Sequence, residues 1–172
     1  MTVRRAVGSD LDQIVDVFLT CWRQSYAAVL PQSLIEMMTV DGAHELWARV
    51  VRESEPGDLL VASGSQHERL LAVARTGPVV DRIGHLASLY VWPGAQGTGV
   101  GRRLMESAMS HLEAAGATSA TLWVFRDNAP SIAFYRHLGW AADGHERTQE
   151  QFGQPELRLV RSLAPDGWAG AR

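Results

Sequence analysis

The chain has 172 residues, of which 46% are hydrophobic and 20% are charged, a composition typical of a globular protein with a sizeable core. Its formal net charge of -3 gives no electrostatic support for binding to nucleic acid or to an anionic membrane. The one cysteine, Cys21, excludes an internal disulfide, and its apolar helical surroundings favour a buried thiol over a nucleophile. Neither a signal peptide pattern nor an apolar run of about 18 residues is present, so we expect a cytoplasmic protein that does not enter a membrane.

The first part of the chain predicts one strand followed by helices. Residues 2–7 alternate like a strand, and either Ser9 or Asp10 then provides a helix N-cap. Three segments follow with apolar side chains at helical spacing, and Pro31 opens the second of them. Helices are predicted over 11–22, 32–38 and 44–52.

Strand patterns dominate after the turn that Pro56 begins. The runs over 59–62 and 69–75 predict a hairpin that turns around Gly64. Further strands are predicted over 84–92, 118–125, 140–141 and 156–161, and further helices over 99–115 and 129–138. This order predicts an α/β (α+β) fold, with a mixed, mostly antiparallel central sheet of about seven strands flanked by helices and one βαβ crossover at 84–125. We expect a single domain over 1–164 and a flexible tail over 165–172.

A glycine-rich turn connects the strand over 84–92 to the helix over 99–115. This glycine loop consists of Gln96, Gly97, Thr98, Gly99, Val100 and Gly101. Glycines let the backbone approach a ligand closely, and the first helical turn adds unpaired N–H groups and the positive end of the helix dipole. Arg102 and Arg103 oppose that dipole, and a bound anion would offset the penalty. The pattern therefore predicts a phosphate site.

Two common phosphate motifs do not fit the glycine loop. The dinucleotide fingerprint requires a third glycine where Arg102 stands, and the Walker motif ends in a Lys that this chain lacks. The loop resembles instead the acetyl-CoA signature of the GNAT superfamily, Gln/Arg-x-x-Gly-x-Gly/Ala. The preceding residues 89–93 resemble the end of that family's fourth strand, and residues 128–140 resemble its second signature, Asn-x-x-Ala/Ser-x-x-Phe/Leu-Tyr-x-x-x-Gly-Phe. The likeness is sharp over 84–140 and weak before residue 60.

The resemblance implies a cofactor, acetyl-CoA, and no metal. Backbone N–H groups over 96–102 are expected to hold its pyrophosphate, and the backbone over 89–91 its pantetheine arm. That strand is expected to carry a bulge and to splay from its parallel neighbour, with an N–H near Leu89 or Tyr90 facing the thioester carbonyl. Asn128 is expected to contact the arm or to cap its helix. The residues implied in cofactor binding are Leu89, Tyr90, Val91, Gln96, Gly97, Thr98, Gly99, Val100, Gly101, Arg102, Asn128, Ser131, Phe134 and Tyr135.

The resemblance also implies two catalytic residues. Tyr135 matches the family's usual general acid, which protonates the departing thiolate, although an aromatic residue in a helix can also pack on a sheet. Many relatives place a Glu base four residues before the position of Leu89, where this chain has His85. A neutral His can act as a base directly or through water, or it can be a hydrogen-bonded strand residue. Strand alternation predicts that His85, Leu89 and Val91 lie on one face.

The implied function is acetyl-CoA-dependent transfer of an acetyl group to a primary amine by direct attack. The acceptor is a small molecule, a protein N-terminus or a lysine, and Trp22, Tyr26, Trp47 and the loop over 149–154 are candidates for lining its pocket. One alternative is a catalytically silent sensor module that binds acyl-CoA, and another is a nucleotide-binding protein whose glycine turn only mimics the family. Relatives often form dimers, so a homodimer is a family expectation.

Overall fold

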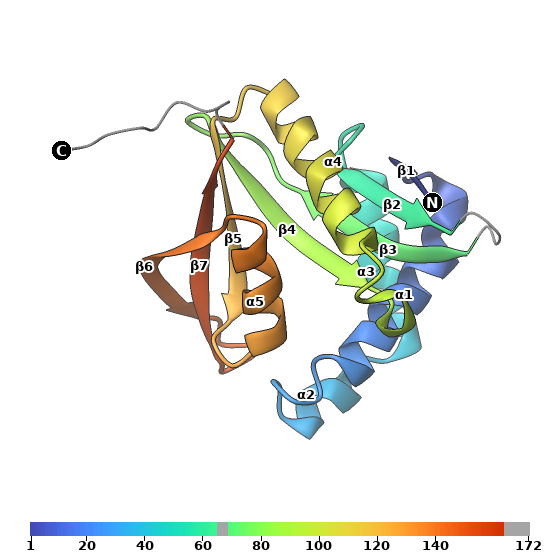
Figure 1. Ribbon diagram of the computed structural model, residues 1–172. Coiled ribbons are helices and arrows are strands. Elements are labelled where there is room, and N and C mark those ends of the chain that lie inside the picture. Colours follow the sequence, from blue (N-terminus) through green and yellow to red (C-terminus); the bar gives the residue numbers. More distant parts are fainter. Residues whose placement is uncertain (65–68, 164–172) are drawn as a thin grey trace.

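Within the residues that the computed structural model describes, 1–64 and 69–163, seven strands form one sheet in the order β1-β2-β3-β4-β5-β7-β6 (Figure 1). The pair β4 and β5 is parallel, and the other neighbouring pairs are antiparallel. The strands are β1 (Thr2–Arg5), β2 (Leu59–Ser63), β3 (Leu70–Thr76), β4 (Ile83–Val91), β5 (Ser119–Phe125), β6 (Ala141–Thr148) and β7 (Pro155–Ser162). The predicted mixed, mostly antiparallel sheet is confirmed.

Helices cover both faces of the sheet and create two cores (Figure 1). The α-helices are α1 (Leu11–Gln24), α2 (Gln32–Met37), α3 (Val40–Glu53), α4 (Val100–Ala114) and α5 (Ala129–His137). Apolar side chains of α4 and α5 pack on one face, where Leu104, Met105 and Leu112 are almost completely buried. Those of α1 and α3 pack on the other face around Phe18 and Trp47. Because each helix presents one apolar stripe, the sheet lies between the two helical layers.

Two element boundaries and one helix cap differ from the sequence prediction for local reasons. The helix α3 begins four residues early because Thr39 caps it, accepting a hydrogen bond of 3.0 Å from the N–H of Gly42. The predicted cap Asp10 precedes α1, but its carboxylate binds Arg4 and the N–H of Val7 instead. The strand β6 continues to Thr148, and the sequence hid it because all of its residues are exposed at the sheet edge. The predicted tail over 165–172 and part of the turn after Gly64 lie outside the described residues.

A β-bulge interrupts the regular alternation of β4. Arg75 pairs with Ser88, and Thr76 pairs with Leu86, so Ala87 is the extra residue. Before the bulge Leu86 packs in the core under α4, and after it Leu89 packs against the same core. His85 therefore points to the opposite face from Leu89 and Val91, and the prediction that all three share one face is wrong. Simple period-two alternation fails here because the bulge shifts the pattern by one residue.

The parallel strands β4 and β5 are joined over only part of their lengths. Residues 83–86 of β4 pair with residues 119–122 of β5. Beyond that point β4 continues beside β3, and β5 continues beside β7. The two strands diverge toward their C-terminal ends, where Figure 1 shows them separating below α4. The splayed parallel pair that the family resemblance implied is therefore present.

We predict that Gly84→Ala destabilises the fold, because α4 packs closely on β4 at this glycine. A Cβ at Gly84 would lie 2.7–3.0 Å from side-chain atoms of Leu112, which is 1% exposed. We expect a loss of about 1–3 kcal/mol in the free energy of unfolding, measured by urea denaturation. Gly8→Ala is the matched control, since a Cβ there meets nothing within 4 Å. Equal stability of the two variants would contradict the close packing.

Candidate active site

A cavity of about 250 Å³ opens where β4 and β5 diverge. One side is formed by α5, the other by α1 and the β6–β7 connection, and the floor by the two strands themselves. We call it the β4/β5 cavity. It brings together Tyr135, His85 and the pair Trp22 and Tyr26, which come from three distant parts of the sequence.

The glycine loop leads from the end of β4 into α4 and presents unpaired backbone donors. Gly97 and Gly99 have positive φ angles of 77° and 86°, a conformation that glycine adopts without strain. Among the hydrogen bonds of the described residues, none uses the N–H of Gly97, Gly99, Val100, Gly101 or Arg102. Such N–H groups, at a helix N-terminus, suit an anion.

The glycine loop differs from the prediction in which of its groups are available. The N–H groups of Gln96 and Thr98 donate to the carbonyls of Pro93 and Ala95, so these two are not free to bind a ligand. The side chain of Arg102 runs along the helix and its Nε lies 2.8 Å from Oε1 of Glu106. That ion pair offsets part of the repulsion between Arg102 and the helix dipole.

The third glycine of the loop, Gly101, allows a close approach between elements. A Cβ at this position would lie 3.1 Å from Val91 and 3.4 Å from the ring of Phe134. The predicted cofactor residue Phe134 therefore packs against the start of α4. This contact holds α5 beside the glycine loop.

The free edge of β4 presents alternate backbone groups to the cavity side. The N–H of Trp92 donates to Leu71 in β3 at 2.7 Å, so Trp92 and Tyr90 direct their backbone groups toward β3. By the same alternation the backbone groups of Leu89 and Val91 point away from β3. The N–H of Leu89, and not that of Tyr90, is thus placed to meet a ligand between β4 and β5.

Tyr135 lies on α5 and lines the cavity. It is only 9% exposed, and its ring packs against Phe134 and Trp140. Burial, reinforced by the nearby Tyr90 hydroxyl, raises the pKa of Tyr135, which keeps the phenol protonated at neutral pH. The cap of α5 is Asn128, whose Oδ1 accepts from the N–H of Ser131 at 3.3 Å. Both of these residues also line the cavity.

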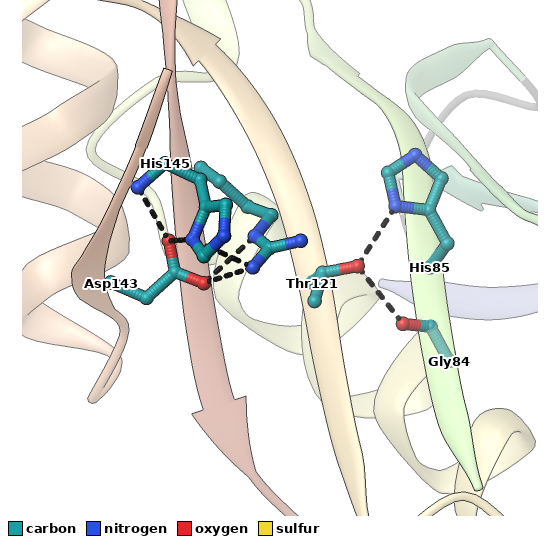
Figure 2. Close-up of polar contacts among 6 residues, drawn as sticks. Gly84, His85, Thr121, Asp143 and His145 are labelled. Carbon is teal, nitrogen blue, oxygen red and sulfur yellow. Dashed lines mark hydrogen bonds and ion pairs between the residues drawn. The ribbon is translucent and has the colours of Figure 1, made fainter. Parts of the chain in front are cut away.

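Two contacts of Thr121 favour one tautomer of His85. Nδ1 of His85 lies 3.1 Å from Oγ1 of Thr121, and that hydroxyl group also lies 3.3 Å from the carbonyl oxygen of Gly84 (Figure 2). A hydroxyl has one proton and the carbonyl can only accept, so both contacts are hydrogen bonds when Thr121 donates to Gly84 and accepts from Nδ1–H of His85. This arrangement favours the tautomer whose lone pair is on Nε2. Burial and the positive charge of Arg147 lower the pKa of His85, so the ring is neutral at neutral pH.

Aromatic side chains form the wall of the cavity on the α1 side. Tyr26 stacks on Trp22 with ring centroids 5.5 Å apart and meets Phe125 edge-on at 5.9 Å. Phe152 contacts both Trp22 and Phe125 from the β6–β7 connection. Trp22, Tyr26, Gln149 and Phe152 line the cavity, and their role in binding an acceptor stays a prediction. The prediction that Trp47 lines the acceptor pocket is wrong, because Trp47 is buried in the core beneath α1 and does not line the cavity.

Cys21 lies beside this wall and is 2% exposed, as its apolar surroundings predicted. Its thiol donates to the carbonyl of Val91 at 3.1 Å. Burial raises the pKa of Cys21 to about 12, which disfavours the thiolate that a nucleophile requires.

The described residues contain neither a cluster of metal ligands nor a membrane-spanning helix. Over 1–64 and 69–163, no three His, Cys, Asp or Glu side chains gather as metal ligands. In the same part of the chain, no helix combines the length and apolarity needed to cross a membrane.

A second polar cluster drawn in Figure 2, of Asp143, His145 and Arg158, lies on β6 and β7 outside the cavity lining.

Residues 17–140 match the Acetyltransferase (GNAT) family. The chain belongs to the GNAT acetyltransferase family. The matched segment includes the glycine loop and α5, so the expected family and enzyme class are confirmed.

Individual relatives agree with this assignment. A probable N-acetyltransferase of Mycobacterium tuberculosis is 28% identical over 180 residues, covering 95% of each chain. The mycothiol acetyltransferase of Streptomyces avermitilis is 44% identical over 59 residues, which are 34% of this chain and only 19% of that protein's length. The crystal structure of the PaiA N-acetyltransferase of Thermoplasma acidophilum, in complex with coenzyme A, has a TM-score of 0.73 at 18% identity, covering 94% of this chain and 98% of that one.

This GNAT chain also contains cavity residues that sequence reasoning missed. Thr121 and Trp123 alternate on β5, while Arg147 on β6 and Glu156 on β7 are direct cross-strand neighbours. An Arg on one strand and a Glu on the next were visible in the sequence. Their pairing depended on the position of β6, which lacks any hydrophobic pattern.

We predict that the pKa of His85 lies below its ordinary value of about 6.5 and that Nδ1 carries the proton in the neutral ring. Histidine ring ¹⁵N NMR shifts recorded across a pH titration measure both properties. Thr121→Val removes the acceptor of Nδ1–H, so the population with the proton on Nε2 should rise. If Nε2 already carried the proton in the wild type, the assigned tautomer would be wrong.

Proposed function

We propose that this chain transfers the acetyl group of acetyl-CoA to a primary amine bound in the β4/β5 cavity. One observation carries this proposal: the imidazole of His85, hydrogen-bonded to Thr121 through Nδ1, and the buried phenol of Tyr135 line the same cavity. The cavity opens beside backbone donors that suit phosphates. A general base and a general acid on opposite sides of one site are what amine acylation requires.

The residues of the glycine loop and of β4 fit acetyl-CoA. The N–H groups of residues 97 and 99–102, which have no acceptor among the described residues, would hold its pyrophosphate. The outward backbone groups of Leu89 and the N–H of Val91 would bind its pantetheine arm along the free edge of β4, since the carbonyl of Val91 already accepts from Cys21 and Gln96. When bound, acetyl-CoA supplies an activated acetyl thioester. The N–H of Leu89 would then stabilise negative charge on the carbonyl oxygen.

The side chains of the cavity move the protons. Nε2 of His85 takes a proton from the attacking amine, directly or through water, and Thr121 holds the ring by its Nδ1–H. The hydroxyl of Tyr135 holds the proton that the departing sulfur requires. A raised pKa keeps that proton in place until negative charge develops nearby.

We predict that Tyr135→Phe lowers kcat by roughly 10²–10⁴-fold and leaves the Kd of acetyl-CoA within about threefold, since the change removes a proton donor but keeps the ring. Stopped assays of thiol release give the rate, and calorimetry gives the Kd. Circular dichroism melting checks that the variant is folded. An unchanged rate would exclude Tyr135 as the acid.

We predict that Gly99→Ala weakens acetyl-CoA binding at least tenfold, because its φ of 86° strains any other residue by about 1–2 kcal/mol and the N–H groups would shift to relieve that strain. Gly116→Ala is the matched control. Gly116 has a φ of 94° at the opposite end of α4, and a Cβ at either glycine meets nothing within 4 Å. Equal losses of affinity in both variants would indicate general destabilisation.

The proposed reaction is tested by mixing the protein with acetyl-CoA and a panel of primary amines, and measuring free thiol and acetylated product. Acetyl-CoA should raise the Tm, because a ligand at one hundred times its Kd increases the free energy of unfolding by about 2.7 kcal/mol. Binding without thiol release for any amine would support the alternative, a silent acyl-CoA sensor. The Tyr135 hydroxyl in the cavity favours the enzyme.

A further inference from the structure

Arg147 stands on the wall of the β4/β5 cavity, and two contacts determine its orientation. Its Nε lies 2.6 Å from Oε2 of Glu156, and its guanidinium carbon lies 4.3 Å from the centre of the Trp123 ring. The first contact directs the Nε edge of the guanidinium group, and the second supports its face. An arginine held in this way loses little further freedom when it binds a ligand.

Glu156 is committed to holding Arg147. It is 6% exposed, and its Oε2 also accepts a hydrogen bond from Nε2 of Gln149 at 2.9 Å. A buried carboxylate is costly unless it is paired and hydrogen-bonded, and these two donors supply that compensation. The register of β6 and β7 places Arg147 directly opposite Glu156, so the sheet itself maintains the pair.

The outer end of Arg147 remains available. In the part of the chain that the structure describes, Nη1 and Nη2 make no hydrogen bond, and the side chain is 41% exposed. A guanidinium group presents its N–H donors as a planar fork that matches the two oxygens of a carboxylate. The cavity therefore contains an oriented guanidinium group whose Nη1 and Nη2 are accessible to an anion.

The charge of Arg147 acts where the amine would react. Burial is the largest cause of the lowered pKa of His85, and the positive charge of Arg147 is the next. The same charge disfavours a second cation beside His85 and attracts an anionic group. An acceptor whose only charge is its ammonium group would lack a partner for Nη1 and Nη2.

We propose that the acceptor carries a carboxylate next to its amine, and that Arg147 binds this carboxylate through Nη1 and Nη2. This inference rests on the proposed acetyl transfer. The aromatic wall of Tyr26, Phe125 and Phe152 suits an apolar side chain, so the substrate class is an apolar α-amino acid. Glu156 and Trp123 are positioning residues for Arg147.

The test compares substrates that differ only in the carboxylate. Suitable pairs are L-alanine and ethylamine, L-leucine and 3-methylbutylamine, and L-phenylalanine and 2-phenylethylamine. For at least one pair the wild type should show a kcat/KM at least tenfold higher for the amino acid. Arg147→Met should lower the ratio of the two kcat/KM values, amino acid to plain amine, by roughly 10–150-fold, the range for a charged hydrogen bond. Its effects through His85 and Glu156 act on both substrates alike and cancel in that ratio.

Two further variants make the result specific. Arg147→Lys retains the charge beside Glu156 but lacks the fork, so it should keep the wild-type Tm and still lose most of the preference for the amino acid. Arg126→Met is the control, since Arg126 pairs with Glu146 on the neighbouring surface and does not line the cavity. It should keep the wild-type preference.

The inference is wrong if the plain amines are acetylated as well as the amino acids, or if Arg147→Met lowers both rates equally. In either case acetyl transfer itself would stand.

If no member of the pairs reacts, calorimetry with coenzyme A present compares N-acetyl-L-phenylalanine with N-acetyl-2-phenylethylamine. Tighter binding of the carboxylate that is lost in Arg147→Met supports the inference, and equal or absent binding overturns it. Failure of the proposed function appears separately, as no transfer to any amine.

Discussion

The parallel hydrogen bonding between β4 and β5 stops after four residue pairs, and the candidate site depends on that interruption. An extra residue at Ala87 bends and twists β4 at this point, so β4 stays with β3 while β5 stays with β7. Continuous pairing would consume the backbone groups of Leu89 and Val91 and would close the space between the strands. The same bulge turns His85 away from Leu89, toward the face where Tyr26 and Arg147 lie.

Burial in the resulting cavity has the same consequence for two different groups. Removal from water disfavours the charged form of any side chain, so it lowers the pKa of His85 and raises that of Tyr135. At neutral pH both are therefore uncharged, one as a proton acceptor and the other as a proton donor. A base and an acid can coexist in one cavity because neither carries a charge that would alter the other.

Electrostatics divide the site into two regions with different means of binding anions. At the glycine loop, backbone N–H groups and the α4 dipole supply the attraction for an anion, and Arg102 is paired with Glu106. In the cavity Arg147 provides a full charge, held by Glu156. The first arrangement suits a ligand with a flexible chain of phosphates, and the second suits a small planar anion of defined orientation.

The sequence by itself determined the local elements and the groups that depend on short spacing. The glycine loop, the cap at Asn128 and Tyr135 belong to continuous segments, because a strand, a turn and a helix define their geometry within a few residues. Only the tertiary structure decided which side chains meet in the cavity. A one-residue bulge reversed the face of His85, an exposed edge strand brought Arg147 beside Glu156, and packing buried Trp47. These outcomes depend on long-range register, which local periodicity does not encode.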